Sequence, residues 1–392
     1  MNVAMLLSCD TFESFFERVL GLDRDSYLAS YRNDFSWYYA KGLIDNGVRP
    51  ILYVPSAQHE GRHETDDGVS VRFLRLPRWY GSLAHLWRAM RVTRWSLYAQ
   101  ERINVALFFN ALNMALRTDN VDLLYVQEYW GGRFDHLTAR LKLPVAAADH
   151  GGVADGVVKW FKPSALKKAA AIYCQTEDEC NQVRQYGADP LLLPNGVDTS
   201  FFHPPATGLR QRKSVLTVAR LTNKQKRTSD LIEAMSLLPP EWTLDIIGTG
   251  PDRGLLEARV HELGVASRVT FHGFKNRADI RTFNQSCGVY AMPSANEGMS
   301  MAVLEAMSCG AAVVASQIRA FEAIISDGVT GRLFPVGNVP LLAEAILDAW
   351  RQREVFGPEA VVAVERFASA GFYPRLAETM QQAAKRGRGE VA

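Results

Sequence analysis

Two carboxylates in the second half of the chain, Glu297 and Glu305, have the spacing and surroundings of a ligand site. A buried strand at 289–292 runs into a small-residue turn, and an apolar helix begins between the two glutamates. This combination suits a diphosphate, because free backbone N–H groups and the helix dipole both point at the anion. Carboxylates would repel a diphosphate, so we expect them to accept hydrogen bonds from diols instead. A molecule with a central diphosphate and diols at both ends is a sugar nucleotide.

Composition narrows the class of protein. The 392 residues are 47% hydrophobic and 22% charged, which is typical of a soluble globular protein of about two domains. A net charge of +2 argues against a dedicated nucleic-acid binder. The five cysteines are odd in number and lack a C-x-x-C spacing, so we expect reduced core residues and neither disulfides nor a zinc site.

We expect neither a targeting segment nor a membrane-spanning segment in this sequence. The first ten residues lack a basic region and are typical of a first β-strand, not of a signal peptide. No apolar run reaches the roughly 18 residues that a spanning helix needs. These observations predict a cytoplasmic protein.

Short apolar runs alternate with amphipathic helix-length segments throughout, which predicts an α/β protein. Turn formers and prolines gather between 194 and 208, so we place the end of a first Rossmann-like domain at 205 and a second domain at 206–369. Two such doubly wound domains would face each other across a cleft at the carboxyl ends of their strands. In the second domain, Asp230 followed by Glu233 predicts a capping box that opens a helix.

Six motifs follow one another between residues 147 and 349. They are the segment 293–310 with its two glutamates, Ala219-Arg-Leu221 with Lys226, Gly248-Thr-Gly-Pro251, Phe271-His-Gly-Phe274, Pro194-Asn-Gly-Val-Asp198 and Asp327-Gly-Val-Thr-Gly331. In type and order they resemble the family 4 glycosyltransferases (glycosyl transferases group 1), retaining enzymes with the two-domain GT-B fold. The resemblance is faint in the first 120 residues. It also implies that a C-terminal helix at about 370–392 packs back onto the first domain.

The resemblance implies a role for each site residue. Arg220 and Lys226 would hold the donor diphosphate and stabilise the leaving nucleotide, which is electrostatic catalysis at the developing negative charge. Glu297 would meet the transferred sugar, and Glu305 would bind the ribose diol. The backbone of Gly298, Met299 and Ser300 would meet the sugar and its phosphate, while Gly248 and Gly250 would form a packing or sugar-nucleotide loop. His150 would lie on the acceptor side near the primary hydroxyl of the sugar.

The resemblance implies no metal, no catalytic base and no cofactor besides the donor, which would be linked to UDP or GDP. Two departures from the family pattern stand out. An extra residue in the segment Thr222-Asn-Lys-Gln-Lys226 would bring Lys226 into register with the following helix, and Lys224 is the competing choice for the phosphate role. The first domain also lacks a Gly-Gly loop after its first strand and has a long aromatic and charged segment, 9–38, in its place.

The resulting hypothesis is a retaining hexosyltransferase-type enzyme. It would move a sugar from a nucleoside-diphosphate sugar to an acceptor hydroxyl, in glycan, polysaccharide or glycolipid biosynthesis. The acceptor itself, whether a glycan, a lipid-linked molecule or a small molecule, stays open. The alternatives are a non-catalytic nucleotide-sugar-binding partner subunit and a sugar-nucleotide epimerase.

The segment 78–95 combines four arginines with three tryptophans. Basic and aromatic side chains at helical spacing can lie on an anionic membrane surface, which predicts peripheral contact at the inner membrane face. The alternative is a core-packed helix whose arginines face water.

Overall fold

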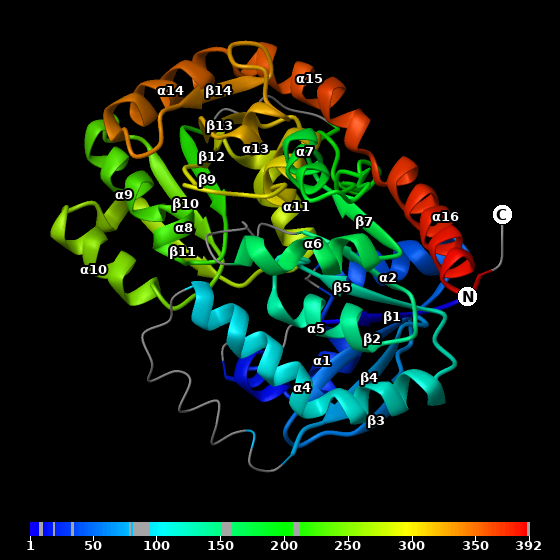
Figure 1. The fold of residues 1–392 in the computed structure, drawn as a ribbon. Helices are drawn as coiled ribbons and strands as arrows, with labels where there is room; N and C mark the ends of the chain where they lie inside the picture. Colours follow the sequence, from blue (N-terminus) through cyan, green and yellow to red (C-terminus); the bar gives the residue numbers. More distant parts are fainter. Residues whose placement is uncertain are drawn as a thin grey trace. The chain divides into compact units, whose positions relative to one another are not determined.

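The computed structural model describes residues 1–7, 11–18, 20–32, 35–77, 80, 94–149, 158–206 and 212–389. They divide into two compact units, each an α/β unit built on its own sheet (Figure 1). The first unit contains residues 1–194 and the C-terminal segment from Phe372, and the second contains Asn195–Gly371.

The boundary lies at 194/195, earlier than the predicted 205/206. Val197 explains the difference, because it forms a parallel bridge with Ala368. Its N–H donates to the Phe367 carbonyl at 2.8 Å, and its carbonyl accepts from Ser369 N at 2.7 Å. The buried Phe202 also packs into the core of the second unit.

The sheet of the first unit has eight strands in the order β3-β4-β2-β1-β5-β6-β7-β8. All neighbours pair in parallel except β3 and β4. The strands are β1 (Asn2–Leu6), β2 (Arg49–Ser56), β3 (Gly61–Glu64), β4 (Ser70–Arg75), β5 (Leu123–Gln127), β6 (Val145–Ala148), β7 (Ala171–Cys174) and β8 (Leu191–Leu192). The central strands are buried on both faces, as is typical of a parallel sheet covered by helices.

Helices cover both faces of this sheet. They are η1 (Glu13–Glu17, a π-helix), α1 (Arg24–Ser30), α2 (Phe35–Asp45), α4 (Arg94–Thr118), α5 (Gly132–Arg140), α6 (Val158–Lys168), α7 (Glu177–Gln185) and α16 (Ser369–Gly387). The last helix, red in Figure 1, brings Phe372, Leu376 and Met380 into the same apolar cluster as Val3 and Met5 of β1. Residues from the far end of the chain therefore complete this core.

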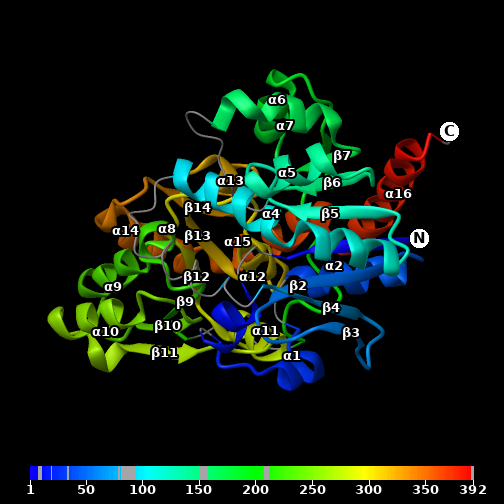
Figure 2. The ribbon, with the colours of Figure 1, turned by 60° about the horizontal axis from the view of Figure 1, so that its bottom comes forward.

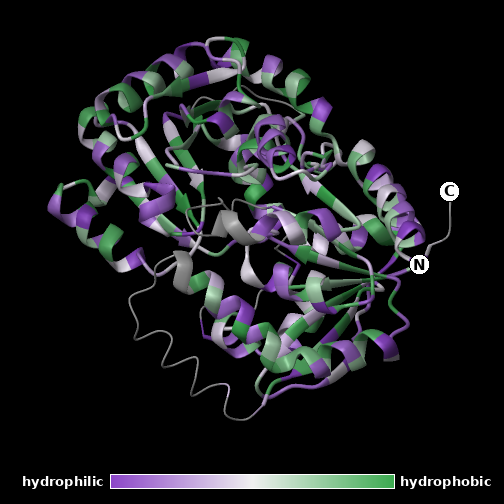
Figure 3. Ribbon diagram, in the orientation of Figure 1, coloured by the Kyte–Doolittle hydropathy of each residue, from purple (hydrophilic) through white to green (hydrophobic). Residues whose placement is uncertain are grey.

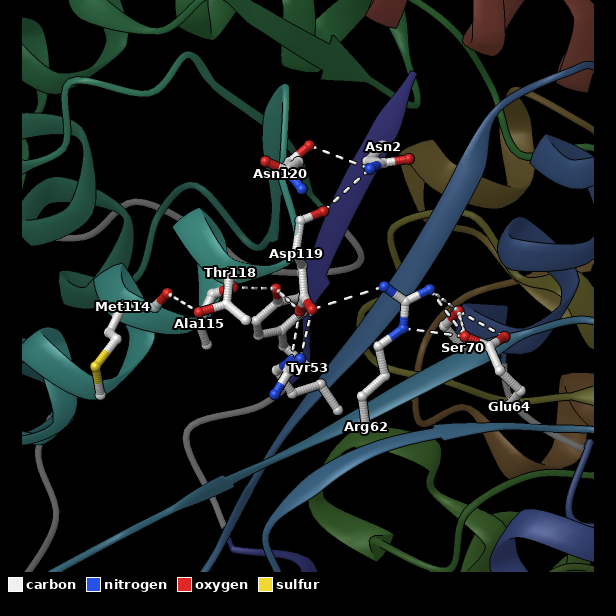
Figure 4. Close-up of polar contacts among 11 residues, drawn as sticks. Asn2, Tyr53, Arg62, Glu64, Ser70, Met114, Ala115, Thr118, Asp119 and Asn120 are labelled. Carbon is white, nitrogen blue, oxygen red and sulfur yellow. Dashed lines mark hydrogen bonds and ion pairs between the residues drawn. The ribbon is translucent and has the colours of Figure 1, made fainter.

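A polar network ties the end of α4 to the neighbouring strands (Figure 4). The Asp119 carboxylate accepts from the Tyr53 hydroxyl at 2.5 Å and from the Arg72 guanidinium. The Asn2 side chain donates to the Asp119 carbonyl at 3.0 Å. Burial alone would raise the pKa of Asp119, but the hydrogen bonds from Arg72 and Tyr53 bring that pKa below its ordinary value. The network therefore favours the ionised carboxylate.

The second unit has a six-stranded parallel sheet in the order β11-β10-β9-β12-β13-β14, and Figure 2 shows β12, β9, β10 and β11 in succession. The strands are β9 (Ser214–Val218), β10 (Thr243–Ile247), β11 (Val269–Gly273), β12 (Val289–Met292), β13 (Ala312–Ser316) and β14 (Gly331–Phe334). The helices are α8 (Asn223–Lys226), α9 (Thr228–Leu237), α10 (Arg253–Glu262), η2 (Ala266–Arg268), α11 (Arg277–Ser286), α12 (Met301–Ser308), α13 (Arg319–Glu322), α14 (Val339–Arg351), α15 (Arg353–Val364) and η3 (Glu365–Phe367). Figure 3 shows the strands of both sheets mainly in the colours of apolar residues.

The strand order positions the site. β9 pairs with both β10 and β12, so the order reverses beside β9. Ligands of open α/β sheets bind at such a switch point, outside the carboxyl ends of the strands.

The predicted capping box at Asp230 is wrong. α9 begins at Thr228, with Arg227 as its N-cap, and the Asp230 side chain binds Arg227 instead. The reason is a local turn: α8 ends at Lys226, and the left-handed conformation of Arg227 redirects the chain so that α9 already begins at Thr228.

Within the described residues, four buried cysteines form no disulfide: Cys174, Cys180, Cys287 and Cys309. No described helix combines the length and the apolar character that a bilayer crossing requires.

Candidate functional site

Three loops meet at the carboxyl ends of β9, β10 and β12. Two backbone hydrogen bonds join the first loop to the strand and loop of β10: Ala219 N donates to Ile247 O at 3.0 Å, and Leu221 N to Thr249 O at 2.9 Å. A third bond, from Ala295 N to Gln225 O at 2.8 Å, joins the first loop to the loop after β12. The switch point is therefore held together mainly by main-chain contacts.

Gly248 and Gly250 allow the first two loops to approach so closely. A Cβ at Gly248 would lie 1.9 Å from the Ala219 carbonyl oxygen, and one at Gly250 would lie 2.4 Å from that of Leu221. Gly248 also has a φ of +132°, which an L side chain rarely adopts. The geometry requires both glycines for packing.

Lys226 and Glu297 form an ion pair in this site. The Lys226 Nζ lies 2.6 Å from Glu297 Oε1, and the two side chains are only 16% and 8% exposed. The Ser294 hydroxyl donates to the same Oε1 at 2.7 Å. Lys224, the competing candidate, is exposed on the same short helix. The structure thus separates the two lysines, since Lys226 makes the contact with Glu297.

Arg220 comes two residues after the end of β9 and is exposed at the same edge of the sheet as Lys226. With Lys224, the chain carries three cations within seven residues of sequence here. Their charge is suited to an anionic ligand.

The turn Gly298-Met299-Ser300 leads into α12. Met299 is buried in the apolar cluster beneath the turn, and Ser300 is the N-cap of the helix. The Ser300 side chain makes no capping hydrogen bond, so no side chain at the N-cap satisfies the first-turn amides. These amides can bind an anion.

Glu305 lies on the second turn of α12 and is only 9% exposed. Burial raises the pKa of Glu305 to about 7, and the positive charge of Arg277 partly opposes this rise. Among the residues that the structure describes, no hydrogen bond reaches its carboxylate oxygens. A buried, ionised carboxylate without hydrogen bonds lowers the stability of the fold unless a ligand supplies hydrogen-bond donors.

Sequence reasoning missed Arg277 and the role of Ser294. Ser294 stands three residues before Glu297, so its spacing within the motif was a usable signal. Arg277 begins α11, is 28 residues from Glu305 in sequence, and has no local signature. Its guanidinium lies 3.4 Å from Asp198 and 4.5 Å from the Phe201 ring. Only the fold reveals its position.

His150 and residues 81–93 lie outside the described residues, so the acceptor-side histidine and most of the basic–aromatic segment stay predictions. Asp149, the preceding residue, is buried after β6. Among the described residues, no group of three His, Cys, Asp or Glu side chains is arranged to hold a metal ion.

Two family models match consecutive parts of the chain. "Glycosyltransferase Family 4" matches residues 35–201, and "Glycosyl transferases group 1" matches residues 202–359. The two matches meet without a gap and together span both units.

Curated relatives are similar over about half of their own length. A D-inositol 3-phosphate glycosyltransferase of Xylanimonas cellulosilytica is 31% identical over 200 residues, which are 46% of this chain and 48% of the relative. A phosphatidyl-myo-inositol mannosyltransferase of Mycobacterium tuberculosis is 32% identical over 197 residues, 48% of this chain and 50% of the relative.

Solved structures are similar over nearly the whole chain. Sucrose-phosphate synthase from Thermosynechococcus elongatus has a TM-score of 0.76 at 17% identity, with 97% of this chain and 98% of that chain covered. HepE of Anabaena, solved in complex with UDP and glucose, has a TM-score of 0.70 at 18% identity, with 97% and 99% covered. At this identity the similarity establishes the fold. The chain therefore belongs to the family 4 glycosyltransferases and has their GT-B fold of two Rossmann-like units.

Proposed function

We propose that this protein is a retaining glycosyltransferase that moves a sugar from a nucleoside-diphosphate sugar to an acceptor hydroxyl. The main support is one observation in the second unit. The Lys226–Glu297 ion pair lies beside the start of α12, where the N-cap side chain makes no capping bond, and Glu305 on the same helix is a buried carboxylate that receives no hydrogen bond from the part of the chain that the structure describes.

The positive groups of this edge match a diphosphate. Arg220 and Lys226 provide cations, and the first-turn amides of α12 provide neutral donors. When the anomeric C–O bond breaks, negative charge grows on the departing diphosphate. Donors that are already oriented stabilise this charge without reorganisation, and removing one costs about 3 kcal/mol in comparable sites.

The two carboxylates match the hydroxyl-bearing ends of the donor. Glu305 is buried and lacks hydrogen-bond donors, so a ribose diol would satisfy it with two O–H groups. Glu297 lies next to Lys226 and would therefore meet the sugar beside the diphosphate. In this arrangement the donor lies along the edge between the ends of β9 and β12.

The finer identity of the substrates follows from relatives only by analogy. HepE was solved with UDP and glucose, and the curated relatives are named for inositol phosphate or phosphatidyl-inositol acceptors. We propose a UDP- or GDP-linked donor that needs no metal, and an acceptor of the glycan, lipid-linked or polyol class. We further propose a cytoplasmic enzyme that meets the membrane through residues 78–95.

A nucleotide-sugar screen tests the proposal. UDP-, GDP- and ADP-sugars are added with and without a chelator, and the unfolding midpoint is measured. A ligand at about 100 times its dissociation constant should stabilise the protein by about 2.7 kcal/mol, equally with the chelator present. E305Q should reduce this stabilisation, while E257Q, at an exposed ion pair on α10, should not. No stabilisation by any donor would refute the proposal.

Turnover separates an enzyme from a non-catalytic partner subunit. Donor hydrolysis or transfer is followed by NMR, which also reports the configuration of the anomeric carbon. Retention of configuration is expected. Binding without turnover would favour the partner subunit, and an inverted product would contradict the retaining mechanism.

A further inference from the structure

Arg227, the residue after Lys226, has an unusual backbone conformation. Its φ of +48° and ψ of +37° lie in the left-handed region. A side chain makes this region unfavourable, and residues held there cluster at functional sites. Arg227 lies next to the proposed phosphate lysine, so what holds it there matters.

The conformation has a clear local effect. Arg227 N donates to Asn223 O at 2.9 Å and closes α8, and Arg227 O accepts from Asp230 N at 2.9 Å and opens α9. The left-handed residue therefore makes the corner between the two helices. Lys226 is the last residue of α8, and the corner leaves its ammonium 2.6 Å from Glu297.

The Arg227 side chain is held by two neighbours. Its Nε donates to Asp230 Oδ2 at 2.7 Å and its Nη2 to Oδ1 at 3.1 Å, a bidentate pair with a carboxylate that is only 6% exposed. The guanidinium also lies against Gly337, where a Cβ would come within 2.9 Å of Nη2. The ion pair with Asp230 and the close contact with Gly337 offset the free-energy cost of the left-handed conformation. They therefore fix the turn between α8 and α9.

The start of α8 is fixed as well. Asn223 N donates to Asp252 Oδ2 at 2.6 Å, and Ser229 N donates to Asn223 Oδ1 at 2.9 Å. Lys226 thus lies on a single turn that is pinned at both ends, which is the preorganisation that a charged group needs for electrostatic catalysis.

We propose that Arg227 is a positioning residue whose clamp with Asp230 and Gly337 holds Lys226 in place for the donor diphosphate. The inference rests on the proposed function, because the clamp matters for activity only if Lys226 meets the donor. A purely structural role would make Arg227 a helix-corner residue and nothing more.

The test compares UDP and GDP binding by calorimetry, donor turnover and thermal stability in R227A, R227K and R227G. R227A keeps the free-energy cost of the left-handed backbone but loses the side-chain contacts with Asp230 and Gly337. Its nucleotide affinity should therefore fall on the order of tenfold. R227K can retain a single ion pair with Asp230 and should recover part of the affinity. R227G relieves the backbone and still lacks the clamp, so it should fold and bind as weakly as R227A.

A double-variant cycle isolates the coupling to Lys226. In a K226M background, R227A should cause no further loss of nucleotide affinity, because the group it positions is gone. The matched control is R259A, which breaks another arginine–carboxylate pair in the same unit, Arg259–Glu233 between α10 and α9. It should leave nucleotide binding unchanged.

The outcomes are distinct. Two results would overturn the positioning role while the proposed function stands. In the first, R227A and R227G bind the nucleotide as tightly as the wild type does. In the second, R227A weakens nucleotide binding in the K226M background as much as it does when Lys226 is present. If the wild type binds neither nucleotide, the proposed function fails and the positioning role fails with it.

Discussion

The carboxyl edges of the two sheets are built in opposite ways. In the second unit the edge consists of short loops joined by main-chain hydrogen bonds, with Gly248 and Gly250 at the closest approaches. Few side chains are needed to hold these loops together, and several of the side chains at this edge carry charge. This edge can offer backbone N–H groups and cations to a ligand.

In the first unit the chain after β1 is filled with aromatic rings instead. Phe16 and Tyr27 have ring centroids 4.6 Å apart, and Phe12 lies 5.3 Å from both. On η1, the Glu13 carboxylate accepts from Ala57 N and Gln58 N at 3.0 Å each and so holds the loop after β2. This segment is fixed by packing between residues far apart in sequence.

The difference shows for which segments a local sequence pattern indicates function. A loop that binds through its backbone and a few charges has a recognisable motif. A segment shaped by side-chain packing has none, because many combinations of rings fill the same volume. Five predictions test this contrast, from the largest expected effect to the smallest.

Replacing Tyr27 with alanine should damage the first unit most. Its side chain is fully buried among aromatic rings, and removing such a group leaves a cavity that costs about 4 kcal/mol. Urea unfolding should show an earlier transition, while the folded variant still binds nucleotide. L97A, at a half-exposed leucine on α4, is the control and should change stability by less than about 1 kcal/mol. Loss of nucleotide binding in folded Y27A would contradict the contrast, because it would show that aromatic packing in the first unit also determines nucleotide binding.

Replacing Lys226 with methionine should lower donor turnover by about 10²–10³-fold, because one oriented cation is lost. The free energy of unfolding should also fall, by roughly 1–3 kcal/mol, because the Glu297 side chain is only 8% exposed and loses its cation. Turnover is therefore measured well below the unfolding midpoint of the variant. K224M on the same turn is the matched control and should keep nearly full activity. Equal losses in both variants would mean that general positive charge, not position, matters at this edge.

Replacing Gly248 with alanine should destabilise the second unit by about 3 kcal/mol, because the new Cβ collides with the Ala219 carbonyl at a positive φ. G254A is the matched control, since a Cβ there meets nothing within 4 Å and the residue lies in α10. It should be neutral or stabilising by up to about 1 kcal/mol. Thermal unfolding measures both, and a neutral G248A would contradict the packing role.

Glu305 should make the stability of the ligand-free protein depend on pH. Burial raises its pKa from the ordinary 4.5 to about 7, so between these values the unfolded chain ionises while the folded protein keeps the proton. Stability is therefore lost as pH rises from about 4.5 to 7, and the loss is complete above pH 7. E305Q should be more stable than the wild type by at most about 3 kcal/mol at pH 8 and by little at pH 4.

Nucleotide affinity should respond in the opposite sense. An ionised Glu305 accepts two hydroxyl donors, so wild-type affinity should fall as pH drops below about 7. E305Q should bind more weakly and with a flatter pH profile, measured by calorimetry. A wild-type affinity that is independent of pH would show that Glu305 does not meet the ligand.

Much of the second unit was predictable. The glutamate pair, the Gly248–Pro251 turn and the alternation of strands and helices indicated the fold and the edge that bears the motifs. Lys226 was preferred over Lys224 only by a register argument. The helix start at Asp230 was predicted wrongly, because the left-handed Arg227 ends α8 and α9 already begins two residues before Asp230. The Asp230 carboxylate then pairs with Arg227 and does not cap the helix.

The sequence by itself determined the α/β class and most of the motifs at the carboxyl edge of the second sheet, because strand periodicity, glycine turns and helix starts are local properties. The resemblance of these motifs indicated the family. Only the tertiary structure decided which lysine meets Glu297, that Arg277 influences Glu305, and that Arg227 forms a clamp. Lys226 and Glu297 are 71 residues apart in the chain. Contacts over such distances arise when two strands become neighbours in a sheet, and no local pattern encodes their geometry.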